Sequence, residues 1–196
     1  MRKAKLERKT KETEIALELN LDGTGEYDIE TGVGFFDHML AHIAHQSLLD
    51  LKILAKGDLE VDAHHTVEDV GISLGQALQE ALGDKQGICR YGTSIIPMDD
   101  ALALAAIDLS GRSHLDFAVP VSGQLGGEFD CEVAREFFLA VSRSGMNIHL
   151  RLLTGMNRHH VLEAVFKAFG RALREAVAID PRRSGIPSTK GMLESK

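Results

Sequence analysis

The chain carries the same five-residue pattern twice, because His-His-x-x-Glu runs from His64 to Glu68 and again from His159 to Glu163. Each copy opens a stretch whose apolar residues recur with the period of a helix. Positions i and i+4 lie on one helix face, so His64 can meet Glu68 on one ion and His159 can meet Glu163 on another. A single copy is more often a partly exposed helix start than a ligand set. Two copies with identical spacing favour two metal-binding helices.

The second histidine of each pair points about 100° away from the first. His65 and His160 therefore cannot easily join the ion held by their own i, i+4 pair, and each should serve the other ion. The pattern predicts two helices and two ions with crossed ligands.

The order of the elements around the two patterns predicts an internal duplication. In the first half we expect a strand over 13–21 with a hairpin partner over 27–31, a helix from Phe35, a strand over 49–54 and a helix over 64–82. The second half repeats this order with strands over 102–109 and 115–121, a helix over 133–142, a strand over 147–153 and a helix over 159–177. We predict an α+β fold in a single domain of residues 1–196, made of two similar halves that each pack a sheet against helices. The halves should span about 1–92 and 93–180, followed by a C-terminal tail over 181–196.

An alignment of the halves extends the predicted ligand set. Placing Gly57 on Gly155 is a shift of 98, and the same shift places His38 on Glu136. The shift from His64 to His159 is 95, which we attribute to a loop insertion in the first half. If His38 and Glu136 each complete one ion, one site holds His38, His65, His159 and Glu163, and the other holds His64, Glu68, Glu136 and His160. Mixed nitrogen and oxygen ligands without thiolate favour six-coordinate manganese or iron over tetrahedral zinc.

A second group of residues is cationic. Arg90 follows the first His-His helix, Arg112 lies in an Asp-Leu-Ser-Gly-Arg turn, and Ser188 and Lys190 stand in the tail. Arginine side chains and Ser/Lys pairs commonly hold phosphate, so phosphate binding is one interpretation of these residues. The alternative is an ordinary solvated face.

Composition excludes several classes of protein. The chain has 22 basic and 29 acidic residues and a net charge of -7, which argues against a nucleic-acid surface. Its two cysteines have no Cys-x-x-Cys spacing, which indicates a reducing compartment. No stretch approaches 18 consecutive apolar residues, so we expect no membrane span and a cytoplasmic location.

Five segments in order resemble one known family, the imidazoleglycerol-phosphate dehydratases. They are GFFDHML at 34–40, DAHHTVED at 62–69, NRHHVLEA at 157–164, FKA at 166–168 and PSTKG at 187–191. The resemblance covers nearly the whole chain. It implies a lyase of histidine biosynthesis that dehydrates D-erythro-imidazole glycerol phosphate to imidazole acetol phosphate, with two manganese ions per active site. It also implies two similar α+β halves, a homo-oligomer of 24 subunits built from trimers, and active sites between subunits.

The resemblance also assigns roles to residues. It implies that the eight ligands predicted above bind manganese, and that Arg90, Arg112, Ser188 and Lys190 contact the substrate phosphate. Glu12 matches an acid of the family that contacts substrate, and it is our candidate catalytic base. The chain departs from many relatives in having Glu136 where they have His. It also has His42 and Gln46 where they often have Gln and His.

The implied chemistry needs an electron sink, because the proton to be removed lies on a carbon with no adjacent carbonyl. An imidazole ring that bridges two divalent ions can lose its own proton, and the resulting imidazolate can expel the neighbouring hydroxyl to leave a diazafulvene-like intermediate. Glu12 would then remove the side-chain proton. Phosphate held by the cations would fix the position of the substrate.

Two other functions use the same residue types. A dinuclear phosphoester hydrolase also needs two ions and cations, and it would release phosphate from simple esters. A storage or structural metal protein would have a coordinatively closed site with no affinity for imidazole or triazole.

Overall fold

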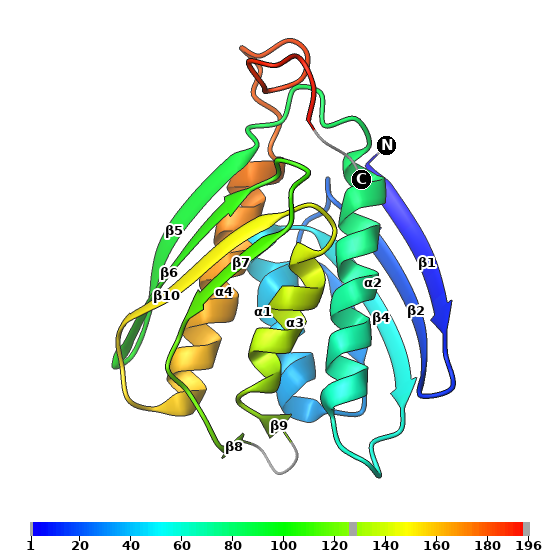
Figure 1. The fold of residues 1–196 in the computed structure, drawn as a ribbon, viewed down its shortest axis with the longest axis vertical. Helices are drawn as coiled ribbons and strands as arrows, with labels where there is room; N and C mark the ends of the chain where they lie inside the picture. Colours follow the sequence, from blue (N-terminus) through cyan, green and yellow to red (C-terminus); the bar gives the residue numbers. More distant parts are fainter. Residues whose placement is uncertain (1, 126–128, 194–196) are drawn as a thin grey trace.

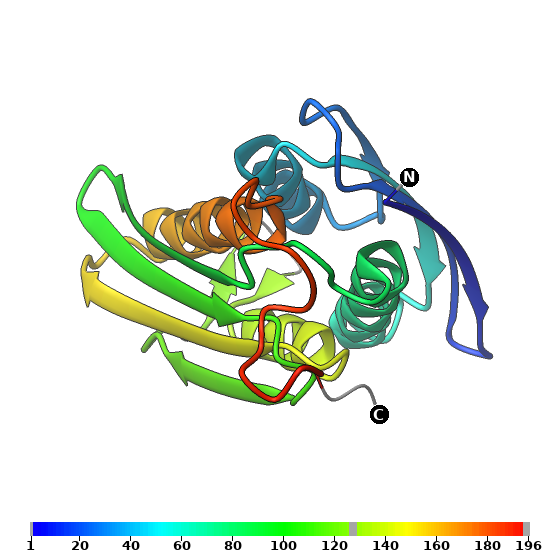
Figure 2. The same cartoon turned by 90° about the horizontal axis from the view of Figure 1, so that it is seen from above.

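The computed structural model describes residues 2–125 and 129–193. Two four-stranded sheets form the outer layers of the molecule, and four helices lie between them (Figure 1). Figure 2 shows the same arrangement from above, with one sheet on each side of the helices. This arrangement gives each helix an apolar environment on most of its surface, so the residues that reach solvent lie mainly at the helix ends.

The first half contains β1 (Lys3–Lys9), β2 (Thr13–Asn20), β3 (Tyr27–Glu30), α1 (Gly34–Ser47), β4 (Asp50–Gly57) and α2 (His64–Leu82). The second contains β5 (Tyr91–Met98), β6 (Ala101–Asp108), β7 (His114–Ala118), α3 (Val133–Ser142), β10 (Asn147–Thr154) and α4 (Arg158–Val177), with a small ribbon of β8 (Gln124–Leu125) and β9 (Phe129–Asp130). The sheet orders are β1-β2-β4-β3 and β5-β6-β10-β7. In both sheets the first three strands are antiparallel and the last is parallel to its neighbour. The predicted α+β fold with two similar halves is confirmed.

The packing of the helices repeats between the two halves, as the order of the strands does. Gly170 of α4 packs on α1, where an added Cβ would lie 2.9 Å from the carbonyl oxygen of Ile43. Gly75 of α2 packs on α3, where a Cβ would lie 2.9 Å from the carbonyl oxygen of Val141. Gly75 and Gly170 differ by 95 and Ile43 and Val141 differ by 98, which are the two shifts found in the sequence. Each His-His helix thus packs on a helix from the other half.

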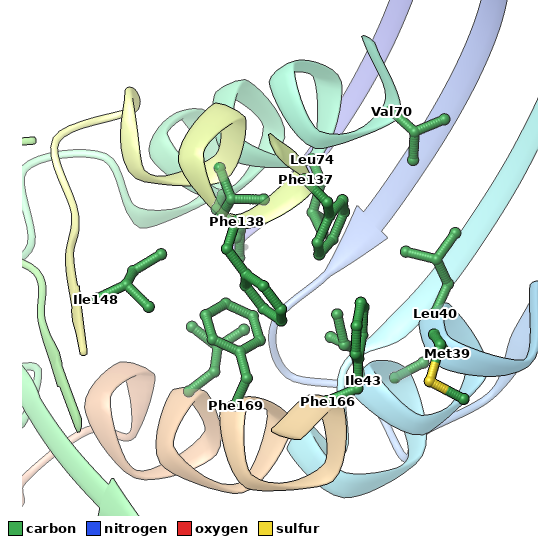
Figure 3. Close-up of a cluster of buried hydrophobic side chains, with 14 of the residues drawn as sticks. Met39, Leu40, Ile43, Val70, Leu74, Phe137, Phe138, Ile148, Phe166 and Phe169 are labelled. Atoms are coloured by element: carbon green, nitrogen blue, oxygen red, sulfur yellow. The ribbon is translucent and has the colours of Figure 1, made fainter. Parts of the chain in front are cut away.

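The core lies among the four helices. Six phenylalanines are fully buried there: Phe36, Phe129, Phe137, Phe138, Phe166 and Phe169. Figure 3 shows rings from α3 and α4 in contact with aliphatic side chains of α1 and α2. Each such side chain stabilises the fold by roughly 1.5–3 kcal/mol. The core therefore fixes the four helices relative to one another, and with them the side chains at their ends.

One strand prediction was wrong. Residues 27–31 do not form a hairpin with β2, because β3 runs parallel to β4 at the far edge, with Tyr27 opposite Leu51. The carboxylate of Asp50 accepts the N–H groups of Thr24 and Glu26, which turns the connection over the end of β4.

Two of the edge strands, β1 and β5, were absent from the sequence prediction. β1 lies in the basic N-terminal segment, where its lysines face solvent and pair with β2, as Lys9 does with Glu14 at 2.8 Å. Charged residues are typical of edge strands. Among the described residues, no helix is both long enough and apolar enough to cross a bilayer.

Candidate active site

Each His-His pair lies at the start of a helix, two residues after a side chain that accepts one of its N–H groups. The Asp62 carboxylate accepts the N–H of His64 at 2.7 Å, and the Asn157 side chain accepts the N–H of His159 at 3.0 Å. Caps of this kind satisfy N–H groups that have no partner within the helix. The two caps are 95 residues apart, so the repeat includes the local signal that starts each helix.

The structure brings three predicted ligands of the first ion together where α1 and α4 meet. His159 Nε2 lies 3.1 Å from Glu163 Oε2, and His38 Nε2 lies 3.5 Å from the same oxygen. His42, one helical turn after His38, joins them with its Nε2 at 3.2 Å from His38 Nε2 and 3.2 Å from Glu163 Oε1. We call these four residues the α1/α4 cluster.

Glu163 is the centre of this cluster and its side chain is only 7 % exposed. Burial by itself would raise the pKa of Glu163, but the Lys167 ammonium at 2.5 Å and the neighbouring histidines outweigh it and lower that pKa to about 2. Burial and the adjacent His38 lower the pKa of His42 to about 4. At neutral pH the cluster therefore offers an ionised carboxylate and a neutral His42, as a cation requires.

The corresponding residues where α2 and α3 meet are more open. His64 Nε2 lies 4.0 Å from Glu68 Oε2, and the other oxygen of Glu68 accepts from Arg143 at 3.0 Å. Glu136, in the first turn of α3, accepts from Arg135 at 2.8 Å. No hydrogen bond or ion pair links Glu136 to His64 or Glu68 in the described part of the chain. His64 and Glu68 are thus paired as predicted, whereas the ligand role of Glu136 stays a prediction.

His65 and His160 point away from the first histidines of their pairs. His65 Nδ1 lies 3.0 Å from Asp58, and His160 Nδ1 lies 2.7 Å from Asp100. A carboxylate at Nδ1 fixes a histidine with Nε2 ready to bind a metal. Over residues 2–125 and 129–193, neither histidine forms a hydrogen bond or ion pair with the cluster predicted to receive it, so the described part of one chain does not close the crossed ligand sets.

Glu12 lies in the turn between β1 and β2 and lines a groove with Lys56, Asp58 and Glu60. The hydrogen bond to Asp58 raises the pKa of His65, and the negative charge of Glu12 adds to this rise. The predicted base is therefore close to a predicted ligand, although the two are 53 positions apart in the sequence.

The predicted phosphate contacts lie around the start of β5, the start of β7 and the tail. Arg90 donates to Asp108 at 2.7 Å and to the Pro187 carbonyl at 2.9 Å, which ties the tail to the sheet. Lys190 N–H donates to Ser188 Oγ at 3.2 Å. Arg112 lines a separate groove that also contains Arg143. The structure joins Arg90 to the tail, and it does not place all four residues in one pocket.

The metal-ligand residues and the Arg90 and tail segment lie at opposite ends of the molecule. In Figure 1 α2 and α4 begin at the bottom, while the tail and the connection into β5 are at the top. α2 has 19 residues, so its ends are about 28 Å apart. This distance exceeds the length of a small phosphorylated metabolite.

Four residues that contact predicted ligands were not singled out from the sequence: Lys167, Asp58, Asp100 and Arg143. Asp100 and Arg143 contact ligands that are 60 and 75 positions away, whereas Lys167 lies four residues after Glu163 and could have been found from that spacing. His42 was noted only as a departure from relatives. Its spacing of four from His38 repeats the spacing within each His-x-x-x-Glu pair, and that signal would have identified it.

Comparisons with known proteins identify the family of this chain. The family model for imidazoleglycerol-phosphate dehydratase matches residues 31–173. Curated proteins of that name from Desulforamulus reducens and Paracoccus denitrificans are 56 % and 57 % identical, over 98 % of this chain and 98 % and 100 % of theirs.

Two solved structures have the same fold. The imidazoleglycerol-phosphate dehydratase of Staphylococcus aureus matches with a TM-score of 0.82 at 40 % identity, over 91 % of this chain and 99 % of that one. IGPD from Pyrococcus furiosus, in complex with (S)-C348, matches with a TM-score of 0.83 at 38 % identity, over 96 % of this chain and 100 % of that one. The chain therefore belongs to the imidazoleglycerol-phosphate dehydratase family, whose members are hydro-lyases.

Proposed function

We propose that this protein dehydrates D-erythro-imidazole glycerol phosphate to imidazole acetol phosphate in histidine biosynthesis, using two manganese ions per active site. The observation that carries the proposal is the α1/α4 cluster. It gathers imidazole nitrogens around a buried, ionised carboxylate in a chain of the dehydratase family. Biosynthesis of an amino acid also supports a cytoplasmic location.

The donor atoms fit a divalent ion. Adjacent ligands at about 2.1 Å from an ion are roughly 3.0 Å apart in octahedral geometry and roughly 3.4 Å apart in tetrahedral geometry. The separations from His38 and His159 to Glu163 are 3.5 and 3.1 Å. Because the donors are nitrogen and oxygen without thiolate, the set suits manganese. His64, Glu68, Glu136 and His160 would hold the second ion, and His65 would complete the first.

The bound ions would supply positive charge that makes the ring proton of the substrate imidazole easier to remove. The protein side chains account for the remaining steps. Glu12 would take the proton from the substrate side chain, and the nearby His65 and Asp58 keep this end of the site polar. Arg90, Arg112, Ser188 and Lys190 would hold the phosphate and so fix the reacting carbons relative to Glu12.

One chain cannot bring these two groups of residues to the same small substrate, because they lie at opposite ends of helices about 28 Å long. We therefore propose that each active site is built from more than one subunit. His65 and His160, which turn away from their own clusters, would then serve ions of neighbouring chains. A 24-subunit assembly of trimers is the arrangement that we propose for this.

The direct test is turnover of imidazole glycerol phosphate by purified protein loaded with manganese, with imidazole acetol phosphate as the measured product. We expect product formation that stops when a chelator removes the metal. No product from a fully metallated preparation would refute the proposal. Phosphate release from simple phosphoesters would instead support a hydrolase. Failure of imidazole or triazole to bind the metallated protein would instead support a storage or structural site.

A further inference from the structure

His42 lies inside the α1/α4 cluster and belongs to neither predicted ligand set. Its Nε2 is 3.2 Å from His38 Nε2 and 3.2 Å from Glu163 Oε1, and its side chain is 17 % exposed. Two imidazole nitrogens at this separation share at most one proton, and a cation between them satisfies both lone pairs. The position of His42 therefore points toward the ion rather than toward solvent.

His38, His42 and Glu163 can each offer one ligand atom to the same ion, and these atoms lie within 4.8 Å of one another. The two ring nitrogens are 3.2 Å apart, His42 Nε2 lies 3.2 Å from Glu163 Oε1, and His38 Nε2 lies 3.5 Å from Glu163 Oε2. These separations are close to the roughly 3.0–3.4 Å between neighbouring ligands of one ion, so an ion about 2.1 Å from both nitrogens and from one carboxylate oxygen would lie among them. His159, at 3.1 Å from the Glu163 carboxylate, borders the same position.

The internal repeat gives His42 no histidine equivalent in the second half. The shift of 98 that relates α1 to α3 places His42 on Ala140. Ala140 is 2 % exposed, and its Cβ would lie 2.9 Å from a Cβ added to Gly71 on α2. The pairing of α2 with α3 is thus too close at this point for an imidazole. Where α2 and α3 meet, Glu68 instead accepts from the cationic Arg143.

We infer that His42 donates Nε2 as an additional ligand to the ion held by His38, His159 and Glu163, so that the two metal sites of the chain are chemically unequal. This inference rests on the proposed function, because it takes the α1/α4 cluster as a manganese site. With five protein ligands instead of four, the α1/α4 ion binds more tightly than the α2/α3 ion. The α1/α4 ion also has one coordination position fewer for exchangeable ligands than the α2/α3 ion has.

The test is a manganese titration of the full-length assembled protein. Binding is measured as the decrease of the EPR signal of aqueous Mn²⁺. His42→Leu removes the nitrogen and keeps an apolar side chain, whereas His42→Gln keeps a hydrogen-bond donor for Glu163. His45→Gln is the matched control, because His45 is exposed on the same helix and lies outside the cluster. Pulsed EPR counts the histidine nitrogens coupled to each ion.

For the unaltered protein we expect two classes of site. Loss of a residue that only hydrogen-bonds to a metal ligand lowers metal affinity about 10- to 100-fold. Loss of a direct ligand should cost at least as much, so both His42 variants should lower the affinity of the tighter site at least about 10-fold. They should also lose one coupled nitrogen there, while the weaker class and the His45→Gln protein stay unchanged. Full affinity and an unchanged nitrogen count in His42→Gln would show that His42 only donates a hydrogen bond to Glu163, and would overturn the inference.

The two proposals fail in different ways. An unaltered protein that binds no manganese would overturn both the proposed function and the role of His42. An unaltered protein that binds two ions per chain with a single affinity, and whose His42 variants do the same, would overturn only the inference about His42. Circular dichroism of each variant verifies that the fold persists.

Discussion

A methyl group added at Gly170 would lie between two helices that carry predicted ligands. The added Cβ would be 2.9 Å from the carbonyl oxygen of Ile43 on α1, which is closer than real Cβ contacts allow. The obstacle is backbone, so relief requires α1 and α4 to separate. Gly170→Ala should therefore cost stability and also disturb the contact of His38 with Glu163.

The magnitude follows from two opposing terms. Alanine in a helix interior is favoured over glycine by about 0.5–1 kcal/mol. Overpacking a dense contact costs about 1–3 kcal/mol. Gly170→Ala should thus lower the free energy of unfolding by about 1 kcal/mol, and by no more than about 2.5 kcal/mol. Gly75→Ala should do the same, because its Cβ would meet the equivalent carbonyl of α3 at the same 2.9 Å.

The assay is urea unfolding followed by circular dichroism, together with manganese titration. Gly34→Ala is the control, since Gly34 is also in a helix and a Cβ there would meet nothing within 4 Å. We expect lower midpoints for Gly75→Ala and Gly170→Ala with an unchanged slope, and no loss for Gly34→Ala. Gly170→Ala should weaken the α1/α4 ion alone. A midpoint for Gly170→Ala equal to or above that of Gly34→Ala would refute the packing argument.

Three further results are expected. Glu12→Gln should abolish turnover and leave manganese content intact, and metal loss in that variant would contradict its role as base. Chelation should reduce the mass of the assembly in analytical ultracentrifugation, and unchanged mass would show that metal does not hold subunits together. Backbone N–H groups hold the pKa of Asp100 well below its usual 3.8, so its stabilising effect is present above about pH 4 and is lost as the pH falls. The melting temperature of Asp100→Asn should fall less steeply from pH 4 to 2 than that of the unaltered protein, and equal slopes would contradict this.

Local patterns in the sequence predicted the helices and the ligand pairs well. The bounds of α2 match the prediction, and α4 begins one residue earlier than predicted, because apolar periodicity is a local signal. The pairing of His159 with Glu163 followed from helix geometry alone. The equivalence of the halves followed from the two shifts, which the glycine contacts reproduce.

Contacts between distant segments were harder to predict. The edge strand β1 has only two apolar residues on its inner face, Ala4 and Leu6, and Arg8 takes the third inner position, so its alternation is too short to predict a half-buried strand. The parallel pairing of β3 with β4 depends on the Asp50 carboxylate, which no periodic pattern reveals. Arg143 reaches Glu68 across 75 positions, and only the packing of α3 on α2 brings the two together.

The division of one active site between chains is the central claim, and subunit mixing tests it most directly. The Glu12→Gln protein lacks the proposed base at one end of the folded subunit, and the Arg90→Ala protein lacks a phosphate contact at the opposite end. The two inactive proteins are unfolded together in equal amounts and refolded with manganese, and each is refolded alone as a control. If each site takes Glu12 and Arg90 from different chains, random assembly should restore about a quarter of the unaltered activity. Mixed assemblies that are no more active than either variant alone would contradict the account.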